Sequence, residues 1–405
     1  MNNLLGITDA LRSLGGIALA IIILLAMVTI HEFGHYIAGK ALGFKINEFA
    51  VGFGPALWKR RSKKTGELFA VRLIPLGGYC AFDGEDEYAD EEGNQEKIEQ
   101  EVNPSENLEK GESVDQTILE NSQTAGAGTS SEEEYPEPKG ERFNDQAPWK
   151  RIIVLVAGAT MNYLLALFII ICTFAFIGQP LYKVAEPQEG GYLDPAYVVG
   201  DIIESVEGEN VYLITDYMDA LSGKKAGEEI SVGVLRNGER QTLTVTLKAD
   251  CDFVNMSDTG KLLKAMGVNG LYMQPVKLGA FETFGRSVAY SWKIGGMVLR
   301  SFGELLTGKL GLEAVGGPIT TITVTAEAAS SSLMSFLNVA ALIGVNLAVF
   351  NLLPIPALDG SKVVFCVIEW IRKKPINRKV ETIIHLVGIV FLFGFAILVD
   401  LLRLF

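Results

Sequence analysis

The run IIILLAMVTIHEFGHYIAGK, residues 21–40, places two imidazoles and a carboxylate at the end of a strongly apolar stretch. A charged side chain at membrane depth costs several kcal/mol, roughly 2.5 to 3.5 on insertion scales, so such residues are rare there and usually functional. The run lacks the basic N-terminal region and the small-residue cleavage site of a signal peptide, which indicates a retained membrane span. Any fold of this chain must therefore give these polar groups partners inside a bilayer.

Four segments are long and apolar enough to cross a bilayer as helices, which takes about 20 residues each. They cover residues 14–39, 151–178, 335–353 and 383–402. Only 49% of the 405 residues are hydrophobic, so the chain also contains enough polar sequence for a water-facing domain. We expect a multi-pass α-helical membrane protein with four transmembrane helices, a membrane-associated β-hairpin and an inserted extracytoplasmic β-rich domain.

Basic residues cluster in two of the connecting loops and predict the orientation of the spans. One cluster lies between the first and second spans and the other between the third and fourth, whereas the 20 residues before the third span contain no Lys or Arg. By the positive-inside rule both clusters are cytoplasmic, so both termini and residues 179–334 are expected outside. The HEFGH string and residues 354–360 would then share one depth, near the cytoplasmic ends of their spans.

The net charge of −13 belongs to one segment rather than to the whole chain. Between Asp83 and Gly140 there are 19 acidic and 3 basic residues, with almost no aromatic ones. Such a segment buries too little apolar surface to offset the entropy of ordering, so we expect a disordered, solvated linker that could also serve as a partner-binding tail. We expect no nucleic-acid partner.

Two stretches outside the spans have the pattern of β-structure. Residues 44–82 contain two alternating apolar runs around a basic, glycine-containing turn, which predicts a β-hairpin at the membrane surface. Its free edges are not tolerated against lipid, so it should lie against the helices or in a cavity. Residues 180–250 predict a small β-rich domain with a short helix ending at Gly223. Residues 279–306 predict an interfacial amphipathic helix, because charges interrupt their apolar positions.

The string HEFGH, which is HExxH, carries the chemistry. Positions i and i+4 share one face of a helix, so His31 and His35 can bind one metal ion with Glu32 beside it. Neutral imidazoles suit zinc, and Glu32 can accept a proton from the attacking water. Two of the chain's three histidines fall in this string. Two histidines that only cap a helix end are the alternative.

Catalytic zinc usually takes three protein ligands plus water, so a third ligand is needed. Asp359, in the string NLLPIPALDG after the third span, is the best candidate, and a lone capping aspartate is the alternative. His385, near the cytoplasmic end of the fourth span, is a rival ligand. The amides of Asn346 and Asn351 need partners within the membrane; they could bind the substrate backbone near the metal or hydrogen-bond between helices.

The paired motifs HEFGH and NLLPIPALDG, in this order around an inserted domain, resemble the bacterial site-2 protease family. The inserted stretch DPAYVVGDIIESVEGENV resembles the strand and turn of a PDZ domain, and there is room for only one such domain. The string AGATMN, residues 157–162, resembles the family's second-span signature, with Ala159 and Thr160 where Gly-Pro is common. The resemblance implies a single zinc ion bound by His31, His35 and Asp359, Glu32 as the catalytic base, and substrate contacts at Asn346, Asn351, Gly52, Phe53 and Gly54.

The resemblance implies a zinc endopeptidase of the bacterial cell membrane that cleaves transmembrane segments of single-pass proteins, such as trimmed anti-sigma factors or signal-peptide remnants. Its partners would be these membrane-spanning substrates and the lipid bilayer. A different membrane metalloenzyme, such as a lipid oxygenase, is one alternative, but those sites usually use many histidines. The other is a non-catalytic scaffold that acts through its PDZ-like domain.

These arguments divide the chain into nine regions. Three of them lie outside the spans on the cytoplasmic side, and two make up the extracytoplasmic part. In chain order, the expected regions are the first span (1–43), the hairpin (44–82), the acidic linker (83–147), the second span (148–179), the PDZ-like domain (180–275), the interfacial helices and connector (276–333), the third span with its LDG string (334–360), a basic loop (361–380) and the fourth span (381–405).

Overall fold

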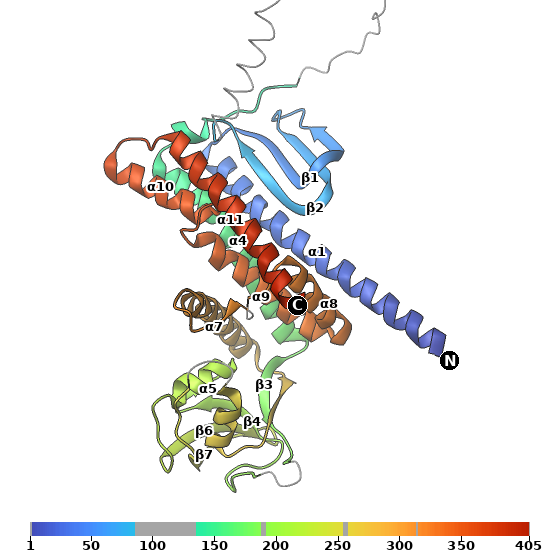
Figure 1. The fold of residues 1–405 in the computed structure, drawn as a ribbon, viewed down its shortest axis with the longest axis vertical. Helices are drawn as coiled ribbons and strands as arrows, with labels where there is room; N and C mark the ends of the chain where they lie inside the picture. The colour runs from blue at the N-terminus through green and yellow to red at the C-terminus, as the bar shows by residue number, and fades with distance from the viewer. Residues whose placement is uncertain (1, 86–134, 188–191, 254–257, 313–314, 405) are drawn as a thin grey trace, which may run out of the picture. The chain divides into compact units, whose positions relative to one another are not determined.

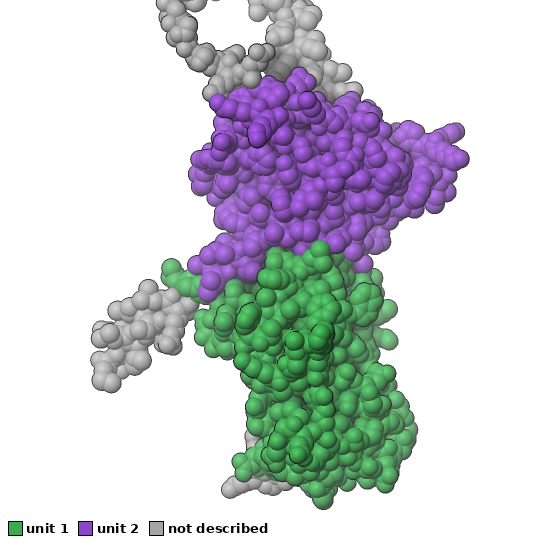
Figure 2. All heavy atoms as spheres, turned by 180° about the vertical axis from the view of Figure 1, so that it is seen from behind, with its two compact units in different colours: residues 1–17, 163–314, 323–349 green, residues 18–162, 315–322, 350–405 purple. Residues whose placement is uncertain are grey.

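A computed structural model describes residues 2–85, 135–187, 192–253, 258–312 and 315–404. The chain divides into two compact units, which Figure 2 shows in separate colours. Unit 1 contains residues 1–17, 163–314 and 323–349, and unit 2 contains residues 18–162, 315–322 and 350–405. Most of the expected acidic linker, from 86 to 134, lies outside the described residues.

Four helices are long and apolar enough to cross a membrane, which confirms the predicted number of spans among the described residues. Proline accounts for two of their ends: Pro148 starts one helix, where its missing N–H costs nothing, and Pro354 follows the end of another. The apolar segments are Leu14–Leu42 of α1 (Asn2–Leu42), α4 (Pro148–Phe176), α9 (Leu333–Leu352) and Arg378–Arg403 of α11 (Arg378–Leu404), all labelled in Figure 1.

Unit 2 contains the predicted hairpin, built from β1 (Ile46–Arg61) and β2 (Leu68–Phe82). Both strands bend, so that Ala50 lies opposite Tyr79 and also opposite Ala70. The first part of β1 is therefore the middle of the sheet, and residues 78–82 form one of its edges. Gly52, Gly54 and Gly77 lie at the bends with positive φ, a conformation that glycine adopts at little steric cost. We expected a simple two-stranded hairpin. The strands bend instead, because glycines interrupt the apolar runs.

The hairpin buries some apolar side chains, such as Ile46 and Phe82, and exposes others. Leu57 is 67% exposed and Trp58 is 51% exposed, on the outer part of β1. Other large apolar side chains of the bent strands are exposed as well: Phe53, Val71, Leu73 and Ile74. A surface of this kind is typical of contact with lipid or with another protein.

The expected basic loop, residues 361–380, is mostly helix: α10 (Asp359–Arg372) starts at the LDG string. The prediction of a loop is wrong. The many basic residues suggested an irregular segment, but Cys366 and Glu369 are buried on one face of a helix. Glu369 accepts a hydrogen bond from Arg151 of α4 and forms an ion pair with Arg378 at 3.2 Å, so one buried carboxylate joins α10 to α4 and to the start of α11.

Unit 1 contains the β-rich domain, a six-stranded sheet in the order β7-β6-β4-β3-β8 with β5 beside β4. Two of its turns, Glu207-Gly208 and Asn237-Gly238, have positive φ at both residues, as is typical of tight hairpin turns. The strands are β3 (Gln179–Val184), β4 (Ile202–Val206), β5 (Glu209–Asn210), β6 (Glu229–Arg236), β7 (Glu239–Thr246) and β8 (Leu271–Val276), and the helices are α5 (Ile214–Leu221) and α6 (Thr259–Met266).

Two further helices follow this domain, α7 (Ala280–Leu306) and α8 (Pro318–Ser331). The face of α7 that carries Ile294 and Val298 packs within a cluster of buried residues from α4 and α9. The opposite face exposes Phe281 and Trp292, at 98% and 77%. This helix is not among the membrane-spanning candidates of the described chain, and its two faces suit an interfacial position.

Candidate metal centre

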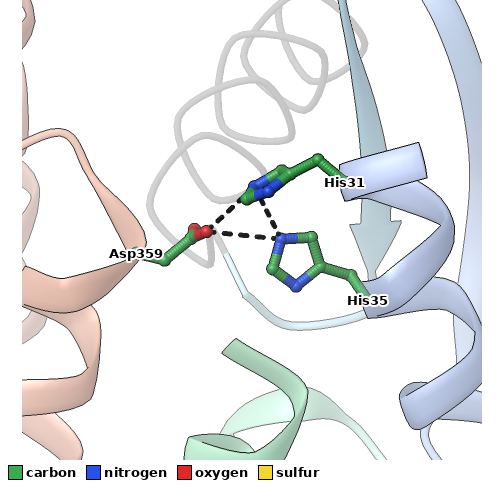
Figure 3. A group of neighbouring side chains, drawn as sticks. All are labelled: His31, His35 and Asp359. Carbon is green, nitrogen blue, oxygen red and sulfur yellow. Dashed lines mark hydrogen bonds and ion pairs between the residues drawn. The ribbon is translucent and has the colours of Figure 1, made fainter. Parts of the chain in front are cut away.

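Three ligand-type side chains of unit 2 converge on one point, as Figure 3 shows. His31 and His35 lie one turn apart on α1, and Asp359 is the first residue of α10. The two Nε2 atoms are 3.2 Å apart, and Oδ2 of Asp359 lies 3.0 Å from the Nε2 of His31 and 3.4 Å from that of His35. These residues form the one group of metal-ligand type found in the described part of the chain.

The donor set and its spacing fit a zinc ion. Zinc binds nitrogen and oxygen donors at about 2.0–2.2 Å in tetrahedral geometry, which places neighbouring donors roughly 3.3 Å apart. The three observed separations lie between 3.0 and 3.4 Å. Three protein donors leave a fourth position for water or substrate, as in catalytic zinc sites.

The remaining ring nitrogens of both histidines contact α4 or α9. Nδ1 of His35 donates to the carbonyl of Val154 at 2.8 Å, which leaves its Nε2 unprotonated toward the site. Nδ1 of His31 lies 3.3 Å from the amide of Asn162 and 3.4 Å from that of Asn351. The Asn162 Oδ1 is buried and has no partner among the described residues, so a half-turn of this amide would let it accept a hydrogen bond from a protonated Nδ1.

Glycines let α1 and α4 approach closely enough for these contacts. A Cβ on Gly34 would lie 2.8 Å from the carbonyl carbon of Ala157, nearer than real Cβ atoms come. A Cβ on Gly158 would lie 2.8 Å from the His31 ring and nearer still to the His35 ring. Small residues at a helix contact are typical of membrane proteins, where close backbone packing stabilises the pair. Here they also leave room for two imidazoles.

Replacing Gly158 by Ala should therefore weaken metal binding. The added methyl group must displace at least one imidazole, and we expect the zinc dissociation constant to rise about 10- to 100-fold, the usual cost of disturbing a ligand's support. Zinc titration of the purified variant measures this. Gly394→Ala is the matched control, because a Cβ there meets nothing within 4 Å. Equal zinc affinity of the Gly158 variant and the native chain would contradict this packing argument.

A cavity of about 540 Å³ opens onto two of the three side chains, His35 and Asp359. Glu32, His35 and Asp359 line it together with residues 79–82 of β2. Gly78, just before this stretch, packs against Glu32, since a Cβ there would lie 3.3 Å from the Glu32 Cγ. The cavity also has charged walls, from an ion pair between Lys362 and Glu85 at 2.6 Å.

The structure brings together some predicted site residues and not others. Asn351 reaches His31, whereas Asn346 lies on the part of α9 that belongs to unit 1 and stays a prediction. Gly52, Phe53 and Gly54 lie at the bend of β1 and not in the cavity lining. His385 is outside the metal group.

Sequence reasoning missed Gly158 and Asn162 as site residues. Both fall within the AGATMN string, and the helical spacing of four residues between them was the signal that could have found them.

The chain is similar to known proteins over most of its length. The model of peptidase family M50 matches residues 19–395. Zinc metalloprotease RasP of Bacillus licheniformis is 29% identical over 95% of this chain and 98% of its own length. Regulator of sigma-W protease RasP of Bacillus subtilis has the same identity and coverage. Zinc metalloprotease RasP of Geobacillus kaustophilus is 26% identical over 91% of this chain and 92% of its own length.

Two features define the class of protein. The chain has helices that can span a membrane, and it has a centre of two histidines and one carboxylate beside a glutamate. Together they are typical of a membrane metallopeptidase. The family model covers all the residues that build this centre, from α1 into α11. The chain belongs to peptidase family M50. This membership confirms the family and the enzyme class predicted from the sequence, a peptidase of the site-2 protease type.

Proposed function

We propose that this protein hydrolyses peptide bonds within the membrane-spanning segments of single-pass membrane proteins. His31, His35 and Asp359 hold one zinc ion in this proposal, and Glu32 is the base. Zinc is the cofactor that the names of the related metalloproteases indicate. The observation that carries the proposal is the 3.0–3.4 Å spacing of the three donors, beside Glu32, two of them on a helix that can cross a bilayer.

Zinc, when bound, acts as a Lewis acid that polarises the peptide carbonyl and makes water a stronger nucleophile at neutral pH. Glu32 lies next to His31 in sequence and lines the cavity, so its carboxylate is placed to take the proton of the attacking water. The same carboxyl can then deliver that proton to the departing amine. Val154 and the amides beside His31 keep both imidazoles oriented through this exchange.

A substrate helix hides its carbonyls in internal hydrogen bonds, so it must unwind before hydrolysis. Residues 78–82 of β2 pair with β1 along one edge, and no strand of the described chain pairs with the other edge. Residues 79–82 also line the cavity. An unwound segment that adds to this edge is held extended beside Glu32 by main-chain hydrogen bonds, which is β-augmentation.

The site faces the cytoplasm in this proposal, and the β-rich domain of residues 180–275 lies outside as a PDZ-like module. The uneven distribution of basic residues supports this orientation. Protease added to intact cells should then cut within this domain, and protection of the domain would reverse the orientation. The name of the Bacillus subtilis relative indicates regulation of sigma-W, and anti-sigma factors are candidate substrates here on that ground.

The PDZ-like domain would act as a size filter that admits only trimmed substrates. Both sides of β3 are already paired, with β4 and with β8, so this strand has no free edge for a peptide. A size filter can still work, because it excludes bulky substrates by their volume and does not need to bind a peptide along a strand. Deletion of residues 182–275 should then increase cleavage of full-length substrates, and an unchanged rate would count against a filter.

Zinc-dependent cleavage in liposomes tests the proposal directly. The purified chain is mixed with a single-pass substrate, with and without a zinc chelator, and the products are mapped by mass spectrometry. We expect cleavage within the apolar segment, loss of cleavage with chelator, and recovery when zinc is added back. Cleavage that persists in chelator, or that falls only outside the apolar segment, would overturn the proposal.

A further inference from the structure

The chain's third histidine contacts the turn that carries the carboxylate ligand. His385 lies on α11, and its Nδ1 accepts a hydrogen bond from the backbone N–H of Ala357 at 3.2 Å. Ala357 precedes Asp359 by two residues. The imidazole therefore binds the main chain of the ligand-bearing turn and does not enter the group of metal donors.

This turn has an unfavourable backbone conformation. Ala357 has φ of +78°, a left-handed conformation that residues with a side chain rarely adopt. Such conformations persist where surrounding contacts hold them, and they gather at functional sites. Inside the turn, the N–H of Leu358 donates to Ile355 at 3.1 Å and that of Ser361 donates to Leu358 at 3.1 Å. Ala357, the strained residue, instead donates its hydrogen bond to a residue outside the turn, His385 of α11.

Gly388 gives α11 a second contact with the same turn, about one helical turn beyond His385. A Cβ on Gly388 would lie 2.6 Å from the carbonyl carbon of Pro356 and 2.7 Å from its oxygen. The absent side chain therefore lets the Pro356 backbone approach α11 closely. Two consecutive turn residues, Pro356 and Ala357, lie against one face of α11.

We propose that His385 is a positioning residue: it holds the strained turn at Ala357 and so fixes Asp359 toward the two metal-binding histidines. The proposal rests on the metal-binding role of Asp359. A histidine that acted only as apolar filling would be replaced equally well by leucine. A histidine that acts through Nδ1 needs an acceptor at that place, which asparagine supplies and leucine does not.

The test measures zinc affinity of the full-length chain in detergent, with His385→Leu, His385→Asn and the native protein. We expect His385→Leu to raise the zinc dissociation constant about 10- to 100-fold, as for other residues that orient a ligand. His385→Asn should restore affinity to within a few fold. Val387→Ala is the matched control, since Val387 lies on the same helix and is 63% exposed. The visible spectrum of the cobalt-substituted protein should change in the leucine variant only.

Equal affinities for the leucine and asparagine variants would overturn the proposal, whether both bind zinc normally or both bind it weakly. The Ala357→Gly background provides a second comparison, and His385→Ala replaces His385→Leu in both backgrounds if the leucine variant fails to fold. Glycine adopts positive φ without strain, so His385→Leu should cost less zinc affinity there than beside Ala357. An equal cost in both backgrounds would exclude the positioning role. Peptide cleavage is not measured in any arm, so failure of this inference leaves the proposed proteolysis untouched.

Discussion

Replacement of Glu32 by Gln is expected to abolish cleavage while the protein keeps its zinc. The amide keeps the shape of the side chain and cannot accept the proton of the attacking water, so a general base is lost. That loss costs typically 10²- to 10⁴-fold in rate. Zinc content should stay at one ion per chain, because the three donors that converge in the structure do not include Glu32.

Single-turnover cleavage of a transmembrane substrate and metal analysis of the same preparation measure both quantities. Glu85→Gln is the matched control: this carboxylate lines the same cavity but pairs with Lys362 at 2.6 Å. Its neutralisation should change the rate only modestly. Loss of zinc in the Glu32 variant would show that Glu32 supports the metal and is not simply the base.

Asp359→Ala should have the opposite signature, with loss of zinc as the primary effect and loss of cleavage as its consequence. Its Oδ2 is the one oxygen donor of the group, 3.0 Å and 3.4 Å from the two Nε2 atoms. Zinc sites contribute roughly 10–16 kcal/mol over their ligands, so removal of one ligand should weaken binding by about 100-fold or more. Isothermal titration with zinc measures the change.

Asp400→Ala is the control for this variant. Asp400 is a buried aspartate that accepts hydrogen bonds from the N–H groups of Ile319 and Thr320 at the start of α8. Its loss should lower thermal stability, at a typical cap cost of about 1 kcal/mol, and leave zinc affinity unchanged. Normal zinc binding by the Asp359 variant would remove this residue from the metal centre.

The spans and the histidine pair were accessible to sequence reasoning because their signals are local. Apolar runs of about 20 residues identify spans without any knowledge of packing. The four-residue spacing of His31 and His35 fixes their common face on any helix. Asp359 is 324 residues beyond His35, and only a shared membrane depth and the resemblance of its motif linked the two.

Other features depend on contacts that no single segment determines. Gly158 matters because the imidazoles of another helix pack against it. The glycine alone therefore does not identify this position as part of the site. The basic residues around α10 suggested a loop, although Glu369 is neutralised by arginines from two other helices. The bent register of β1 and β2 likewise follows from where the glycines allow each strand to fold back.

The exposed apolar side chains of the hairpin have a consequence for handling and biogenesis. A sheet edge that carries Leu57 and Trp58, 67% and 51% exposed, is a template for pairing with a second copy in water. Natural sheets usually block such edges with charge or cover them. Here Lys59, Arg60 and Arg61 supply charge on the same strand, while lipid or detergent has to cover Leu57 and Trp58. Withdrawal of detergent should therefore expose both apolar side chains to water and promote aggregation.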